Sequence, residues 1–353
     1  MTSTTTSTTT STTTGTTQPG AAADSAADSA QPAPGTVTVN SQGADTRVKA
    51  LQRFALSLSV FTLAGHLILG FEQSPITPLL AMATSYGVAL LLEAVDSWAH
   101  RRPPQYAGGA RAVAAFLLPA HITALACAML LYGNASVWPY LFAVVVAHAT
   151  KYLIRLRIGG KPRHVLNPSN VGIVVTLLVF SWVGIAPPYH FTNYITGAWD
   201  WLLPLAILAA GTMLNATLTG KIPLILGWVG GFALQAVLRW LVLDHALVGA
   251  LLPMTGLAFV IYTNYMITDP ATSPVKPRNQ FVFGFTNALV YGLLVVCGVV
   301  FGFFFALVIT CVLRAGVLLV AERRRAAAVA GTGVGAAIGK VAAPAGTPAG
   351  RMS

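Results

Sequence analysis

Charged residues are scarce in this 353-residue chain, because Lys, Arg, Asp and Glu together make up only 9% of it. Average soluble domains carry roughly 25% charged residues. The mean hydropathy of +0.69 is also far above that of a soluble protein, and an apolar content of 55% is too high for a disordered chain. These values exclude a soluble globular enzyme and predict an all-α polytopic membrane protein.

Acidic residues are the scarcest charged group, with 10 Asp and Glu against 21 Lys and Arg and a net charge of +11. A basic chain can bind nucleic acid, but the inner loops of membrane proteins also collect Lys and Arg. The hydropathy favours the second explanation, so we expect a lipid bilayer and no nucleic acid as partner. The only cysteines are Cys127, Cys297 and Cys311. They lie in apolar runs without a C-x-x-C pair, so we predict neither a disulfide framework nor a metal site.

The composition divides the chain into three regions. Residues 1–46 are rich in Thr, Ser, Ala, Gly and Pro and contain no Lys or Arg, which predicts a disordered tail rather than a signal peptide. Residues 47–322 contain the long apolar runs and form the expected transmembrane domain. Residues 323–353 are Ala- and Gly-rich with a basic start, and we expect a second disordered tail there.

About ten apolar runs in 47–322 approach the roughly 20 residues that a spanning helix needs. We expect helices near residues 48–70, 76–95, 112–132, 137–156, 169–186, 201–218, 222–243, 248–267, 281–298 and 300–321. The last two divide one nearly unbroken apolar run. We place the division at Gly298 and Gly302, because glycine permits a tight turn.

The basic residues indicate an orientation. With both termini in the cytoplasm, 19 of the 21 Lys and Arg fall on the inner side, whereas Glu72, Asp200 and Asp244 fall in outer loops. Such asymmetry predicts a multi-pass protein of the inner (cytoplasmic) membrane with an even number of spans. The exceptions are Arg239, which either extends to the surface or pairs with Asp244, and Arg314, which needs a partner that the sequence does not name.

Two acidic residues lie near the inner end of the second expected helix. Glu93 and Asp96 are i,i+3 neighbours. Intramembrane acids are functional candidates, but Arg101 and Arg102 follow directly. Pairing at the membrane interface is therefore at least as good an interpretation.

Histidines offer a second open question. His121 and His148 lie in the third and fourth expected helices, roughly 10–15 Å from their inner ends. Neighbouring antiparallel helices would allow the two imidazoles to act as axial haem ligands. The favoured alternative is that each is a separate interior hydrogen-bonding residue.

Two proline-containing segments on the expected inner face, 161–170 and 267–278, are the main site candidates. Asn167 precedes Pro168 and Asp269 precedes Pro270, so each pair is suited to cap a helix. Irregular backbone at membrane depth is tolerated when it is buried in protein or lines a cavity. The candidate residues are Asn167, Ser169, Asn170, Thr268, Asp269, Thr272, Ser273, Lys276 and Arg278.

Helix N-termini together with Lys276 and Arg278 would suit an anion such as a phosphate. The alternative is that both segments are capped helix ends with ordinary inner-loop charge. The sequence identifies no particular catalytic residue, so the catalytic residues are unknown, and it contains no ATPase, zincin or hydrolase motif.

These same segments resemble a known family. Residues 268–274 read TDPATSP, followed by Pro277, Arg278 and an apolar helix with Phe283-Gly284, and residues 167–172 read NPSNVG. Both are similar to the T-D-P-x-T-S-P and N-P-x-x-V-G segments of the RnfD/NqrB family, in the same order. Those proteins are membrane subunits of flavin-dependent electron-transport complexes, so the resemblance implies an RnfD/NqrB-like fold.

A closer resemblance is to the UnbU family of enediyne antibiotic biosynthesis membrane proteins. It rests on residues 164–170 (HVLNPSN), 184–192 (GIAPPYHFT), 218–224 (LTGKIPL), 230–239 (GGFALQAVLR) and 253–256 (PMTG). The resemblance implies a redox-linked membrane component that works with other redox or biosynthetic pathway proteins. A transporter for export or self-resistance, and a membrane anchor for soluble pathway enzymes, remain alternatives.

One departure from the family concerns its cofactor. RnfD and NqrB carry FMN on a threonine of an S/T-G-A-T motif in the outer loop after the N-P helix. The corresponding residues here are Thr196-Gly-Ala-Trp199, and tryptophan has no hydroxyl to form the phosphoester. The resemblance therefore implies FMN or riboflavin bound non-covalently, if a flavin is present.

Overall fold

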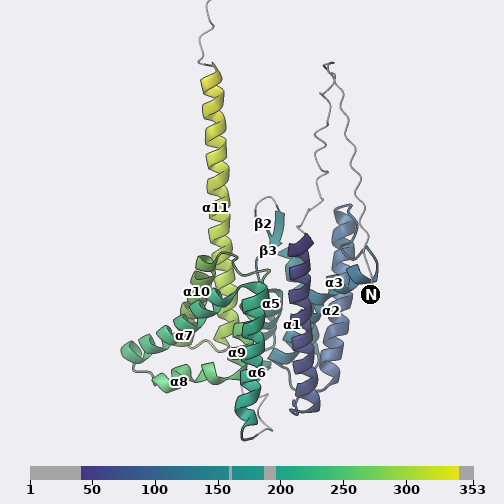
Figure 1. Ribbon diagram of the computed structural model, residues 1–353, viewed down its shortest axis with the longest axis vertical. Helices are drawn as coiled ribbons and strands as arrows, with labels where there is room; N and C mark the ends of the chain where they lie inside the picture. Colours follow the sequence, from purple (N-terminus) through teal and green to yellow (C-terminus); the bar gives the residue numbers. More distant parts are fainter. Residues whose placement is uncertain (1–40, 159–160, 187–195, 342–353) are drawn as a thin grey trace, which may run out of the picture. The chain divides into compact units, whose positions relative to one another are not determined.

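The structure is a computed structural model that describes residues 41–158, 161–186 and 196–341. Its described residues form helical segments joined by short connections (Figure 1). The helices are α1 (Ser41–Leu67), α2 (Ile76–Ala99), α3 (Ala110–Leu130), α4 (Trp138–Leu153), α5 (Pro168–Val179), α6 (Trp199–Leu214), α7 (Ile222–Leu243), α8 (Leu247–Leu251), α9 (Leu257–Ile261), α10 (Pro277–Val296) and α11 (Gly302–Val341). Short π-helical segments, Asn215–Thr219 and Tyr262–Met266, extend α6 and α9, and a 3-10 turn, Leu252–Thr255, follows α8.

Six of the described helices are long and apolar enough to cross a membrane, and a seventh span results if the bent pair Leu247–Thr255 and Ala258–Met266 counts as one. The class of all-α membrane protein is therefore confirmed, whereas the number of ten spans stays a prediction. α4 has 16 residues and α5 has 12. At 1.5 Å per residue both are shorter than the hydrocarbon core of about 30 Å.

Short strands account for these shorter helices. The helix expected over 169–186 ends at Val179, and Gly184–Ile185 (β4) pairs with Leu131–Tyr132 (β1). The helix expected over 137–156 ends at Leu153, because Arg155–Ile158 (β2) pairs with Lys161–His164 (β3). Both pairs are antiparallel. Alternation of basic and apolar residues along β2 is the period-2 pattern of a strand.

Two expected boundaries also differ. The N-terminal tail was predicted to extend over 1–46, but α1 already begins at Ser41, and residues 1–40 lie outside the described part of the chain. The C-terminal tail was predicted over 323–353, but α11 continues to Val341. Alanine and arginine, which fill the start of that segment, have high helix propensity, so the helix does not end with the apolar run.

The predicted division of the last apolar run is confirmed. α10 ends at Val296 and α11 begins at Gly302, and the two helices pack against each other. Gly298 adopts φ +73° in the turn, which is the left-handed region that glycine enters readily. Phe301 adopts φ +60° in the same turn.

Glycines bring α7 and α10 into close backbone contact. A Cβ on Gly227 would collide with the carbonyl oxygen of Phe281, and a Cβ on Gly284 would collide with the carbonyl oxygen of Leu224. Membrane helices commonly use small residues in this way. The α7–α10 pair is consequently the most closely packed in the described chain.

An aromatic cluster fills the space between α7, α9, α10 and α11. Trp228, Phe232 and Tyr262 are fully buried. The ring of Tyr291 stacks on Phe303 with centroids 4.7 Å apart. The Trp228 indole donates a hydrogen bond to Thr263 (2.9 Å), which satisfies its N–H in an apolar environment.

Other helix pairs include α4 with α5, and α2 with α3 and α4. α1 differs from them, because its backbone makes only sparse contacts with the other described helices. It is held mainly by apolar side chains, of which Phe54 and Leu58 are buried.

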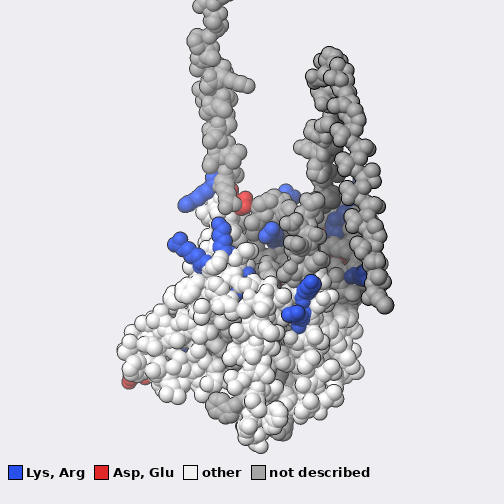
Figure 2. Space-filling view, viewed as in Figure 1, with Lys and Arg blue, Asp and Glu red and all other residues white. Residues whose placement is uncertain are grey.

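Basic side chains gather at one end of the helices in Figure 2. They lie around β2, β3 and the middle of α11, whereas most of the remaining described surface in this view is uncharged. Large exposed side chains of the described residues, such as Leu226, Trp240 and Leu241, are apolar. The surface is therefore suited to a lipid bilayer.

Candidate functional site

The two proline-containing segments predicted from the sequence meet in the structure. Asn167 caps α5 as expected, since its side-chain oxygen accepts hydrogen bonds from the backbone N–H of Asn170 (3.1 Å) and from Ser169 Oγ (2.9 Å). Its amide nitrogen donates to the carbonyl oxygen of Met266 (3.2 Å). Asn167 is buried. One side chain therefore begins a helix and fixes the second segment beside it.

The predicted helix cap at Asp269 is wrong. Its carboxylate accepts hydrogen bonds from the backbone N–H of Ala271 (3.2 Å) and from Thr272 Oγ1 (2.8 Å), which forms a turn and not a helix. Two further prolines explain the difference. Pro274 and Pro277 disfavour helical backbone in the residues before them, so the next helix begins only at Pro277, after an extended Lys276.

Most of the remaining candidate residues bond within the protein. Thr268 Oγ1 donates to the carbonyl oxygen of Asn264 (2.6 Å), and Ser273 Oγ donates to that of Asp269 (2.6 Å). The amide of Asn170 donates to the carbonyl oxygen of Phe304 on α11 (2.9 Å). These side chains are buried, and their contacts hold irregular backbone in place.

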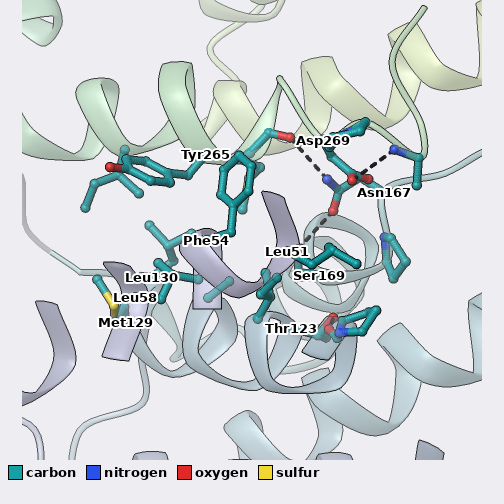
Figure 3. Close-up of a pocket in the computed structure, with 18 of the residues that line it drawn as sticks. Leu51, Phe54, Leu58, Thr123, Met129, Leu130, Asn167, Ser169, Tyr265 and Asp269 are labelled. Atoms are coloured by element: carbon teal, nitrogen blue, oxygen red, sulfur yellow. Dashed lines mark hydrogen bonds between the residues drawn. The ribbon is translucent and has the colours of Figure 1, made fainter. Parts of the chain in front are cut away.

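A cavity of about 150 Å³ opens where the two segments meet (Figure 3). Its walls come from α1, α3, the start of α5 and the segment 261–271. The apolar lining includes Leu51, Phe54, Leu58, Ile122, Met129, Leu130 and Tyr265. Of the predicted site residues, Asn167, Ser169 and Asp269 line it. The cavity thus brings together Asn167 and Ser169 of the first segment and the Asp269 carboxylate of the second.

The two predicted cationic ligands lie elsewhere. Lys276 and Arg278 are exposed at the start of α10 and do not line the cavity. Lys151, in the last turn of α4, and His164, at the end of β3, line it instead. Neither residue was predicted from the sequence as a site residue, although His164 belongs to the segment 161–170 and lies three residues before Asn167.

Two cations, the buried Lys221 and the half-buried Arg314, anchor the second segment from the other side. Lys221 Nζ donates to the carbonyl oxygen of Pro274 (2.5 Å), and Arg314 donates to that of Thr272. Arg314 therefore has the partner that the sequence could not name. Burial lowers the pKa of Lys221 to about 8, the charge of Asp269 opposing this shift and that of Arg314 adding to it.

The expected pairing of the α2 acids is confirmed for Arg102, and Arg155, which was not predicted, joins it. Arg102 contacts Glu93 (2.6 Å) and Asp96 (2.5 Å), and Arg155 contacts Asp96 (3.0 Å). Glu93 is fully buried and also accepts a hydrogen bond from Tyr152 (3.1 Å). The network ties the end of α2 to the end of α4 and to β2, so it stabilises the basic end of the bundle.

Each interior histidine has its own hydrogen-bond partners. His121 contacts Ser59 through Nε2 (2.7 Å) and Tyr86 through Nδ1 (2.6 Å). His148 contacts Ser85 through Nε2 (2.7 Å). This geometry matches the interior hydrogen-bonding interpretation, and haem ligation stays a prediction.

Arg239 follows neither of the two predictions made for it. It is only 8% exposed, so it does not extend to the surface. Asp244, which ends α7 in a left-handed conformation, forms no ion pair with it in the described part of the chain.

Comparison with models of known protein families finds no match, and comparison with curated protein sequences also finds none.

Proposed function

We propose that the protein is a redox-linked membrane component of enediyne biosynthesis that binds a flavin non-covalently in the cavity beside Asn167 and Asp269. One observation carries the proposal. The two segments that resemble the RnfD/NqrB family line one cavity, and Asn167 of the first donates a hydrogen bond to Met266, directly before the second. The resemblance to the UnbU family supports the pathway, in which the protein would pass electrons to a tailoring step through other pathway proteins.

The cavity fits part of a flavin. A volume of about 150 Å³ accommodates one benzene-sized ring, and the rings of Phe54 and Tyr265 offer apolar contact. Asn167 and Ser169 supply polar atoms at one side. The Asp269 carboxylate disfavours a phosphate nearby, whereas Lys151, which also lines the cavity, favours one. The lining therefore suits either riboflavin or FMN.

A bound flavin would supply one- and two-electron transfer. The residues of this chain would bind and orient it. Leu51, Leu58 and Leu130 would exclude water from the ring, since they form the apolar part of the wall. Asn167 would hold the two segments together and keep the cavity in shape.

The test is an absorption spectrum of the protein purified in mild detergent, with two variants on α1. Leu58 is buried and lines the cavity, whereas Leu56 is 64% exposed on the same helix. We expect flavin bands in the natural protein and in Leu56→Trp, and their loss in Leu58→Trp, because the indole fills the cavity. A natural protein without a chromophore would refute the proposal, and so would equal flavin content in both variants.

Covalent attachment is tested separately. Trp199, at the position of the family's acceptor threonine, is exposed at the start of α6. We expect no fluorescent band on a denaturing gel under ultraviolet light, even when a flavin transferase is co-expressed. A band that disappears in Thr196→Ala would show that the loop is aligned incorrectly.

Transport is the second candidate, and one observation favours it. The pair Leu247–Thr255 and Ala258–Met266 is bent by 65°, and π-helical segments interrupt the ends of α6 and α9. Transporters often bind substrates at such discontinuous helices. Uptake of an enediyne intermediate into proteoliposomes, together with the absence of a chromophore, would favour transport over electron transfer.

A further inference from the structure

A second cavity, independent of the one beside Asn167, lies at the end of α7. It has a volume of about 340 Å³ and is lined by Arg239, His245, Ala246, Gly249, Ala250, Pro253, Tyr291 and Val295. This volume lies within the range of pockets that hold small molecules. We infer that Arg239 and Tyr291 bind an anionic oxygen group here, either a phosphate or a carboxylate.

Arg239 is the main reason for this inference. The side chain lies one helical turn before the end of α7 and is 8% exposed, and its buried Nε has no hydrogen-bond partner within the described part of the chain. No Asp or Glu oxygen in the described residues forms an ion pair with its guanidinium. A buried charge is strongly unfavourable unless it is paired, so an anion in this cavity would complete the environment of Arg239.

Tyr291, on α10, lines the same cavity as Arg239. Its ring is fixed by stacking on Phe303 (4.7 Å between centroids) and on Phe232 (5.1 Å). A phenolic hydroxyl can donate to an anionic oxygen. Because these contacts already fix the Tyr291 ring, it does not have to be ordered on binding.

Guanidinium geometry defines the chemical class of the ligand. Arg presents two parallel N–H groups that match the oxygens of a carboxylate or phosphate. His245, exposed at the rim, adds an imidazole that can donate a hydrogen bond. Trp240 and Leu241, beside Arg239 in the sequence, are exposed apolar residues of α7. The phosphate can therefore come from an anionic lipid or from a soluble molecule.

The experiment measures binding in two arms with the full-length protein in mild detergent. One arm measures the thermal shift with inorganic phosphate and with acetate. The other measures, by native mass spectrometry, retention of phosphatidylglycerol against phosphatidylcholine. Retention of phosphatidylglycerol alone assigns a lipid headgroup, and stabilisation by a soluble anion assigns a free ligand; either result supports the site.

Two variants and a control complete the test. We expect Arg239→Gln to lose at least about tenfold in affinity while its melting temperature without ligand stays equal or rises, because an unpaired buried charge has been removed. Tyr291→Phe should lose severalfold, and Arg53→Gln, which changes an exposed arginine of α1, should bind normally. Absence of binding in both arms would overturn the inference. So would a ligand-free melting temperature that falls in Arg239→Gln while affinity is unchanged.

Discussion

The side-chain amide of Asn167 donates a hydrogen bond to the carbonyl oxygen of Met266, although 99 residues separate the two in the sequence. The same side chain accepts the backbone N–H that begins α5. Asn167 therefore both begins α5 and holds it against Met266. The shape of the cavity beside Asn167 depends on both of these contacts.

Replacing Asn167 with alanine removes the cap and the contact together. Loss of an N-cap costs about 0.5–2 kcal/mol, and the carbonyl of Met266 loses its side-chain donor as well. We expect a lower melting temperature and weaker flavin retention in Asn167→Ala. Asn279→Ala changes an exposed asparagine of α10 and serves as control. Equal behaviour of both variants would contradict the role of Asn167.

The glycines of α7 allow a test of the α7–α10 contact. Gly227→Ala forces a methyl group against the carbonyl oxygen of Phe281, whereas a Cβ on Gly230 meets no atom within 4 Å. Overpacking costs about 1–3 kcal/mol, and Ala in place of Gly in a helix gains about 0.5–1 kcal/mol. Thermal unfolding in detergent should show destabilisation for Gly227→Ala and equal or higher stability for Gly230→Ala.

The ion pairs of α2 predict different effects for two adjacent arginines. Arg102 contacts both Glu93 and Asp96, whereas Arg101 is exposed. Arg102→Ala leaves the buried Glu93 without its charged partner. Because Arg102 is itself partly exposed, we expect about 1–3 kcal/mol of destabilisation, less than for a fully buried pair. Arg101→Ala should have little effect on the melting temperature, and a comparable loss in both variants would refute this assignment.

The lowered pKa of Lys221 predicts how the free energy of unfolding changes with pH. Burial lowers the pKa of Lys221 from 10.5 to about 8. Between these values the unfolded chain binds more protons than the folded chain, so the free energy of unfolding rises with pH. Melting temperatures measured from pH 8 to 10.5 should therefore contain an increase that Lys221→Met lacks. Lys276→Met, at an exposed position, should retain it.

Reporter fusions test the number of spans. With ten spans, the chain after Ala198 lies outside and the chain after Arg325 lies in the cytoplasm, as the distribution of basic residues predicts. Fusions at the two positions should report opposite compartments. A shared compartment would refute the ten-span topology, with the short α4 and α5 as the first candidates for segments that do not cross.

Local features of this fold could be predicted from the sequence. Asn167 before Pro168 identified the start of α5, and Gly298 identified the turn between α10 and α11. In both cases the residue's own backbone preference decides the conformation. Asp269 before Pro270 has the same preference, but two further prolines delay the next helix to Pro277.

The composition of the cavity could not be predicted in the same way. Lys276 and Arg278 share a segment with Asp269, yet Lys151 and His164 are the basic residues that line the cavity. Which basic residues face the cavity depends on how α1 and α3 pack against α5. This packing cannot be derived from a single sequence. The hydrogen bond from Arg314 to the Thr272 carbonyl oxygen likewise depends on helix packing.

The loose attachment of α1 bears on how a ligand could arrive. Leu51, Phe54 and Leu58 of this helix form one wall of the cavity beside Asn167, and its backbone contacts are sparse. Apolar side chains and the contact of Ser59 with His121 (2.7 Å) hold α1 in place, whereas α5 is also fixed by its cap and by Asn170. An apolar molecule dissolved in the membrane would have a lateral route of entry at α1, without passing through water.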